Sequence, residues 1–211
     1  MPKNTNILTK AHIGIRVSIM NNMPLYVITN QEDIFSDIDG TVIDIETIGD
    51  FDKRYRHDSR NYRNIKQVIF GCIDTNKLCI YCACGNQGIT ELQEITKKIL
   101  GNLKRPFYAF NCVFESSVWF NHIGIRIEFD GELQRFRYEN KKEAVASLQI
   151  PNYDDPFYDE GVKCIEAWNC GNVKHAVAHN RACLLKERDI LIKRGYRIPD
   201  KCAFIEKVNE E

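Results

Sequence analysis

Apolar residues in the first two thirds of the chain follow the two-residue period of β-strands. In residues 13–19, isoleucine and valine alternate with Gly14, Arg16 and Ser18, which predicts a half-buried strand. Similar alternating or continuous apolar runs predict further strands at residues 25–28, 42–45, 67–73, 77–84 and 107–110.

Longer apolar periods predict helices, most of them in the last third of the chain. Helices are expected at residues 90–100, 115–121, 141–148, 161–170 and 173–193. Thr90 and Asn172 are suitable N-caps, and Gly101, Gly124 and Gly195 stand near helix ends. Strands mixed with helices and followed by further helices predict an α/β fold. We place its domain at residues 31–211, with residues 1–30 as an N-terminal β extension, either part of that domain or a short appendage.

The composition is that of an ordinary globular protein and excludes strong charge steering. Of the 211 residues, 44% are hydrophobic and 27% charged, and 29 basic residues balance 29 acidic ones. Binding to nucleic acid therefore needs a local basic patch. No apolar stretch approaches the roughly 18 residues of a membrane span, and residues 1–10 carry no signal-like apolar core. We expect a cytoplasmic protein without a membrane partner, whose nine cysteines are buried thiols or metal ligands.

Two carboxylates stand two residues apart at the end of a predicted strand. Asp44 and Glu46 belong to the segment Val-Ile-Asp-Ile-Glu-Thr, and the strand period puts both on one face. Such a pair can share a hard divalent cation. Considered alone, the pair also fits a strand edge with solvated acids.

Two later segments add candidate ligands. Asn111 and Glu115 follow the predicted strand at 107–110 and lie where the next helix begins. His179, Asn180 and Cys183 lie within the long C-terminal helix. Divalent-cation sites are usually formed by several acidic side chains that come from separate segments of the chain.

Together, these segments resemble the motifs of the DEDD 3′–5′ exonuclease superfamily, in particular its uncharacterised predicted exonucleases. Asp-Ile-Glu-Thr at 44–47 resembles the first motif, Asn-Cys-Val-Phe-Glu at 111–115 the second, and His-Asn-Arg-Ala-Cys at 179–183 the third. The resemblance covers roughly residues 38–195. It implies a ribonuclease H-like mixed sheet flanked by helices, and a metal-dependent exonuclease that acts on DNA or RNA.

The same resemblance implies roles for individual residues. Two Mg²⁺ or Mn²⁺ ions are held by acidic groups, one activating water and the other stabilising the leaving oxygen. Asp44, Glu46 and Glu115 correspond to the metal ligands, and His179 to the residue that orients or deprotonates the water. Thr47 and Asn111, within the first two motifs, are predicted to contact the substrate, as are Arg54 and Arg63 of the basic segment that follows the first motif.

The third motif departs from the pattern, and two alignments remain open. If His179 takes the place of the motif's tyrosine, Cys183 replaces its aspartate. If His175 is instead the motif histidine, Asn180 replaces that aspartate. Either alignment loses one carboxylate, which weakens Mg²⁺ binding because a thiol is a soft ligand. The chain is then a weakened nuclease, a nuclease with a different metal, or a pseudonuclease that only binds nucleic acid. Should neither position matter, the next acids to test are Glu187 and Asp189.

A basic segment with interleaved tyrosines follows the first motif. Residues 53–66 carry six lysines and arginines, Arg54 and Arg63 among them, together with two tyrosines. Cations there can follow phosphates while tyrosines stack on bases. A solvated surface loop explains the segment equally well.

Two other patterns offer alternative chemistry. Asp37 and Asp39, within Asp-Ile-Asp-Gly-Thr, resemble the first motif of haloacid dehalogenase-type phosphatases, but the polar residues before them do not form a central strand. Cys79, Cys82 and Cys84 have a spacing found in zinc sites. Strand geometry sends Cys79 to the opposite face, so buried thiols are the favoured interpretation.

Overall fold

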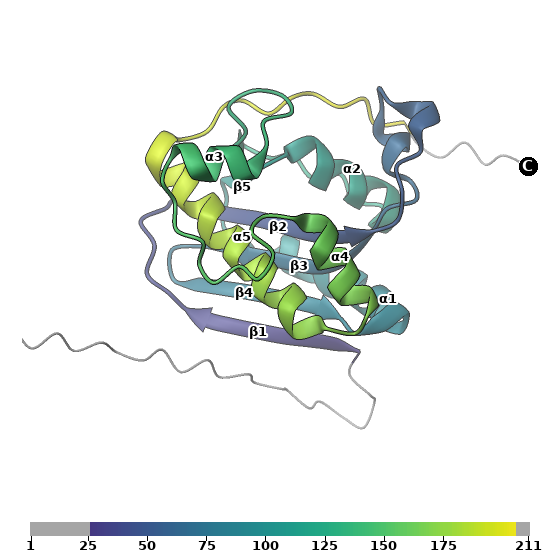
Figure 1. Cartoon of the computed structure of the whole chain (residues 1–211). Coiled ribbons are helices and arrows are strands. Elements are labelled where there is room, and N and C mark those ends of the chain that lie inside the picture. The colour runs from purple at the N-terminus through teal and green to yellow at the C-terminus, as the bar shows by residue number, and fades with distance from the viewer. Residues whose placement is uncertain (1–25, 206–211) are drawn as a thin grey trace, which may run out of the picture.

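The computed structural model describes residues 26–205 and contains one six-stranded mixed sheet (Figure 1). The strands are β1 (Val27–Asp33), β2 (Thr41–Ile48), β3 (Lys66–Ile73), β4 (Lys77–Ala83), β5 (Phe107–Ala109) and β6 (Gly131–Glu132). Their spatial order is β1-β4-β3-β2-β5-β6. The α/β class predicted from the apolar periods is therefore confirmed.

The strand that carries Asp44 and Glu46 lies inside the sheet. β2 pairs antiparallel with β3 on one side and parallel with β5 on the other. β4 continues the antiparallel part, and β6 continues the parallel part. The sequence predicts residues 42–46 as the central strand, with residues 67–73 and 77–84 on one side and residues 107–110 parallel on the other, and the order of β2 to β5 agrees. All eight residues of β2 are buried or half-buried, because both faces of the sheet are covered.

Helices cover both faces of the sheet. They are α1 (Gly85–Leu100), α2 (Cys112–Ile123), α3 (Lys141–Ser147), α4 (Gly161–Asn169) and α5 (Val173–Arg194). α5 packs across β2, β3 and β4, with α4 beside it (Figure 1). Gly71 of β3 allows α5 to approach closely, since a Cβ there would meet Asn180 Oδ1 at 2.2 Å. On the opposite face, Phe70 packs against Trp119 of α2.

Several element boundaries differ from the sequence prediction. α1 begins at Gly85 instead of Thr90, because the polar turn before the apolar stripe is also helical. α2 begins at Cys112 instead of Glu115, since Asn111 caps it by accepting from Phe114 N. The two-residue strand β6 was not predicted. The boundary proposed between residues 30 and 31 falls inside β1, and the strand predicted at residues 13–19 lies outside the described residues.

Two further findings bear on function. Among the helices of residues 26–205, none combines the length and the apolar character needed to cross a membrane. Residues 34–36, which would form the central strand of a phosphatase, connect β1 to β2 without strand structure.

Candidate metal-binding pocket

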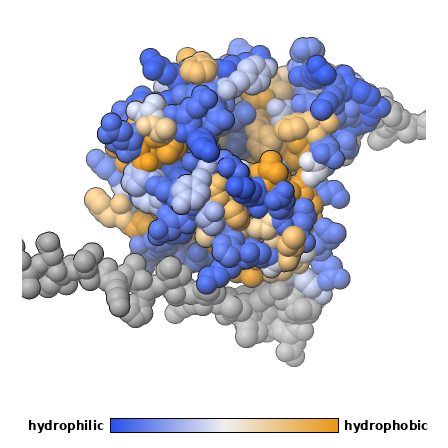
Figure 2. Space-filling model, viewed as in Figure 1, coloured by the Kyte–Doolittle hydropathy of each residue, from blue (hydrophilic) through white to orange (hydrophobic). Residues whose placement is uncertain are grey.

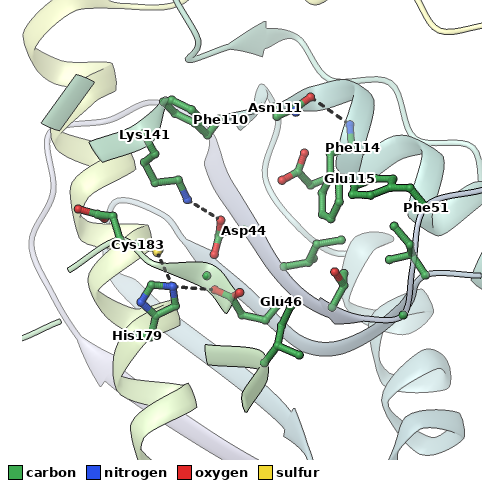
Figure 3. A pocket seen from close by; sticks show the side chains of 17 residues that line it. Asp44, Glu46, Phe51, Phe110, Asn111, Phe114, Glu115, Lys141, His179 and Cys183 are labelled. Atoms are coloured by element: carbon green, nitrogen blue, oxygen red, sulfur yellow. Dashed lines mark hydrogen bonds and ion pairs between the residues drawn. The ribbon is translucent and has the colours of Figure 1, made fainter. Parts of the chain in front are cut away.

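A pocket of about 360 Å³ lies along the C-terminal half of β2, between α2, α3 and α5. In the space-filling view, apolar side chains lie inside a hollow that polar side chains surround (Figure 2). Its wall includes Asp44, Glu46 and Glu115 together with Lys141, His179 and Cys183, as Figure 3 shows. Four elements that are distant in sequence, β2, α2, α3 and α5, thus supply titratable groups to one cavity.

The carboxylates reach the pocket from β2 and α2. Asp44 and Glu46 project from one face of β2 before the bulge between Glu46 and Thr47. Glu115 stands in the first turn of α2, which Asn111 anchors directly after β5. Glu115 is 4% exposed, and its Oε2 has no hydrogen-bond partner among the described residues. A buried carboxylate oxygen without a partner is unfavourable unless a ligand completes it.

Asp44 is held by partners on both oxygens. Lys141 Nζ donates to Asp44 Oδ1 at 3.0 Å, and Asn180 Nδ2 donates to Asp44 Oδ2 at 2.7 Å. The same Lys141 ammonium forms an ion pair with Glu187, which is fully buried in α5. Lys141, the first residue of α3, therefore binds two acids, and its side chain is only 20% exposed.

Acidic groups outnumber the cations around this pocket, and their protonation reflects that excess. Burial raises the pKa of Glu46 to about 7, and Asp44 adds to the shift while His179 opposes it. Burial, followed by repulsion from Asp44, raises the pKa of Glu115 well above its usual value. Burial also raises the pKa of Glu187 despite Lys141. An additional cation would relieve these shifts, because it favours the ionised carboxylates.

His179 belongs to a hydrogen-bonded network that joins α5 to the segment before α4. Its Nδ1 lies 2.8 Å from Asp155 Oδ1, and Lys186 Nζ donates to Asp155 Oδ2 at 2.8 Å. Bonds from His179 and Lys186 outweigh the effect of burial and lower the pKa of Asp155, so Asp155 is ionised and Nδ1 donates. Nε2 of His179 consequently faces Glu46 Oε1 at 3.7 Å.

The protonation of His179 does not suit a base in the metal-free protein. Burial lowers its pKa, but Cys183, Asp155 and Glu46 outweigh that effect and raise the pKa to about 11. Protonated at Nε2, the ring is a donor toward Glu46 and Cys183. The role of water-activating base, implied by the sequence resemblance, requires this proton to leave first.

The predicted site residues divide into those that line the pocket and those that do not. Lining residues are Asp44, Glu46, Thr47, Asn111, Glu115, His179 and Cys183. Asn180 lies behind Asp44 as its hydrogen-bond donor. His175 is exposed and bonds to Asn172, away from the acids. Of the two alignments of the third motif, the one that uses Cys183 agrees with this placement.

The arginines of the basic segment form a compact network of their own and do not line the pocket. Arg54 and Arg63 both pair with Asp52, and Arg60 pairs with Asp58. All three guanidinium groups lie over the ring of Tyr55, between 4.2 and 5.6 Å from its centroid. The ring and the arginines are thus engaged with one another, and two aspartates offset much of the positive charge.

The other two patterns do not form sites. Asp37 and Asp39 are exposed, and Asp39 pairs with Lys104 at 2.7 Å. The two aspartates therefore lack the buried strand end that a phosphatase nucleophile requires. Cys82 is buried, whereas Cys79 and Cys84 are half-buried, and the three do not converge with one another.

Several charged residues in the pocket wall or bonded to it were not among the predicted site residues. Lys141 and the Asp155–Lys186 pair were missed, and Glu187 was named only as a fallback. Glu187 lies one helical turn after Cys183, so the i, i+4 spacing on one helix face was the available signal. Lys141 is 97 residues from Asp44 in the chain, and no local pattern predicts that contact.

The chain was compared with protein families, curated proteins and solved structures, and the comparisons do not assign a function. No protein-family model matches this chain, and no curated protein or solved structure is significantly similar to it.

Proposed function

We propose that this chain is a metal-dependent 3′–5′ exonuclease with a ribonuclease H-like fold, which hydrolyses phosphodiester bonds in DNA or RNA. The observation that carries the proposal is the convergence of Asp44, Glu46 and Glu115 on one pocket in which acids outnumber cations. Catalysis of phosphoryl transfer by divalent cations needs such a set of oxygen ligands.

The topology supports the fold part of the proposal. Three antiparallel strands, β2 to β4, are extended on the β2 side by two strands parallel to it. In the superfamily that the chain resembles, the first motif stands on the first core strand, and here β2 is the strand where the antiparallel and parallel parts meet. Asp44 and Glu46 occupy that strand in this chain.

The residues present fit a divalent cation. Glu115 Oε2 is buried without a partner, and ligand atoms of Asp44, Glu46 and Cys183 lie within 4.8 Å of one another. Asp44 and Glu46 would hold Mg²⁺ or Mn²⁺, which would supply an activated water and stabilise the leaving oxygen. Glu115 faces the same pocket from α2 but lies outside the 4.8 Å cluster, so it would serve as the more distant ligand. Asn180 orients Asp44 through its hydrogen bond to Oδ2.

The remaining pocket wall suits a nucleotide. Phe51, Phe110 and Phe114 line it, and Phe51 is 48% exposed. Phe51 and Phe114 pack edge-to-face with ring centroids 6.4 Å apart. Aromatic rings beside a cation site can stack on a base while the cation binds the phosphate.

A nucleic-acid-binding pseudonuclease is the second candidate, and one observation favours it. Lys141 already provides a positive charge between Asp44 and Glu187, and the third motif has no aspartate. A chain that keeps the pocket but satisfies its acids with lysine would bind a phosphate backbone without cleaving it.

Digestion of labelled single-stranded DNA and RNA, with Mg²⁺ and separately with Mn²⁺, tests the proposal. We expect shortening from one end, and loss of at least about a thousandfold in rate for Asp44→Asn, because an amide cannot neutralise the bound cation. Asp50→Asn is the matched control, since Asp50 is exposed beyond the end of β2. Binding of the oligonucleotide without cleavage by any variant would contradict the exonuclease and favour the pseudonuclease.

A further inference from the structure

The α4–α5 side of the pocket carries ligands of a different chemical kind from the β2 side. Glu46 Oε, Cys164 Sγ and a ring nitrogen of His179 all lie within 4.8 Å of one another. Cys183 Sγ lies 3.7 Å from His179 Nε2. One thiol, one imidazole and one carboxylate thus lie together, and a second thiol, that of Cys183, lies beside His179. Figure 3 shows His179 and Cys183 near Glu46.

The spacing of these atoms resembles that of ligands around a tetrahedral ion. Bonds of about 2.0 Å to nitrogen or oxygen and 2.3 Å to sulfur put neighbouring ligand atoms roughly 3.3–3.8 Å apart. His179 Nε2 is 3.7 Å from both Glu46 Oε1 and Cys183 Sγ. Cys164 of α4 is almost fully buried and belongs to the cluster with Glu46 and His179, which Cys183 adjoins through His179.

The surroundings of His179 resemble those of a metal-binding histidine. Its Nδ1–H donates to Asp155, which fixes the ring and leaves Nε2 directed at Glu46 and Cys183. Asp155 is itself held by Lys186 and by the backbone N–H groups of Phe157 and Asp159. A carboxylate behind the histidine is the usual support for a metal-bound imidazole, because it sets the tautomer and orientation.

We propose that Glu46, Cys164, His179 and Cys183 form a site for one thiophilic divalent ion of the Zn²⁺ class. Thiolate and imidazole select such an ion over Mg²⁺, whereas Asp44 and Glu115 offer only hard oxygen. On binding, the two thiols and His179 Nε2 release their protons to solvent, and four metal–ligand bonds form. No oxidation or reduction takes place.

The proposed ion goes beyond the exonuclease and does not depend on it. Glu46 is the only ligand common to both sets, so the thiophilic ion would lie beside the hard-cation position. Ordinary packing of buried thiols is the competing explanation for the two cysteines. It explains neither the convergence on Glu46 nor the carboxylate that holds His179.

Titration of the purified, metal-stripped full chain with Co²⁺ and then Zn²⁺ tests the site without substrate. We expect one equivalent of Co²⁺ to give the thiolate-to-metal absorption band and the visible bands of a tetrahedral ion, and Zn²⁺ to displace it. Mg²⁺ should give no such displacement. Cys164→Ser and Cys183→Ser should each weaken Zn²⁺ binding at least tenfold and reduce the thiolate band.

Cys170→Ser is the matched control, because Cys170 is exposed at the end of α4 and outside the cluster. Circular dichroism of each serine variant shows whether it is folded, and Zn²⁺ binding is compared only among folded variants. If both variants at 164 and 183 unfold, His179→Gln replaces them, with the same loss expected. Co²⁺ without a thiolate band, or Zn²⁺ affinity equal in the cluster variants and the Cys170 control, would overturn the site. Loss of nuclease activity with intact Zn²⁺ binding contradicts only the exonuclease.

Discussion

Asp155 and Glu115 are two buried carboxylates with opposite surroundings. Asp155 accepts hydrogen bonds from His179, Lys186 and two backbone N–H groups, and its pKa is lowered despite burial. Glu115 has one oxygen without a partner, and its pKa is raised by burial and by Asp44. The first carboxylate is saturated by the protein, whereas the second lacks a counter-charge.

The difference extends to the regions around the two acids. Beneath α5, Lys186 also donates to Asp159 at 2.7 Å, so that this cation is fully engaged although its side chain is completely buried. Around the pocket, Lys141 alone faces Asp44 and Glu187, with Glu46 and Glu115 nearby. Buried charges are unfavourable unless they are paired. We therefore expect the network around Asp155 to stabilise the fold, and the acids of the pocket to bind a cationic ligand.

Removal of the cation in the saturated region should have the largest effect. Lys186→Met leaves Asp155 and Asp159 buried without their ammonium, and we expect a loss of about 3–5 kcal/mol in the free energy of unfolding. Urea denaturation measures it. Lys193→Met, at an exposed position of the same helix, should change the free energy by less than about 0.5 kcal/mol. Equal effects in the two variants would show that the Asp155 network is not structural.

The two regions should respond to pH in opposite directions. Because the folded pKa of Glu46 is about 7 and the ordinary value 4.5, the folded state holds the proton more tightly in that interval. Stability of the metal-free protein is then full below pH 4.5 and falls as the pH rises toward 7, by roughly 3 kcal/mol at about 1.4 kcal/mol per pKa unit. Asp155 acts in the other direction, since its lowered pKa costs stability as the pH falls below 3.8.

Urea titrations in EDTA at pH 4.5 and 7.5 measure the Glu46 contribution. Glu46→Gln should reduce the fall by roughly 3 kcal/mol, the contribution of Glu46, because an amide does not titrate. The contributions of Glu115 and Glu187, whose pKa values are also raised, should remain. Glu94→Gln, on the exposed surface of α1, should leave the fall unchanged. A wild-type protein equally stable at both pH values would show that the pocket acids are not strained by burial.

The sequence predicted the strand side of the pocket better than the helical side. Asp44 and Glu46 lie two residues apart on one strand, so local geometry alone put them on one face. Asp155 comes from the connection between α3 and α4, where neither strand nor helix periodicity directs a side chain. Lys141 is the first residue of α3, a helix that the sequence predicts, but its period does not tell which strand the helix meets. Their contacts depend on how α3 and α5 pack on the sheet, which no segment of the chain specifies by itself.

Substitution of Lys141 tests whether the acids of the pocket lack a cation. Its ammonium occupies space beside Asp44 Oδ1 that an incoming cation would need. We expect Lys141→Met to raise the affinity for Mn²⁺ about tenfold, equivalent to about 1.4 kcal/mol. Calorimetric titration measures it, and Lys142→Met is the control because its ammonium is exposed and pairs only loosely with Glu160. Weaker Mn²⁺ binding by Lys141→Met would mean that the lysine holds the acids in position for the cation.

Replacement of Cys183 should give the smallest effect and depends on the identity of the metal. Cys183 lines the pocket within 4.8 Å of Asp44 and Glu46 ligand atoms, so Cys183→Asp adds a hard oxygen ligand there. We expect a gain of several-fold in nuclease rate and in cation affinity, larger with Mg²⁺ than with Mn²⁺, because Mg²⁺ is the less thiophilic ion. Cys183→Asn is the neutral control of similar size.

Asn180→Asp should instead weaken the site, since it replaces the donor to Asp44 Oδ2 with a second carboxylate. A gain from Asn180→Asp and none from Cys183→Asp would restore the alignment in which His175 is the motif histidine.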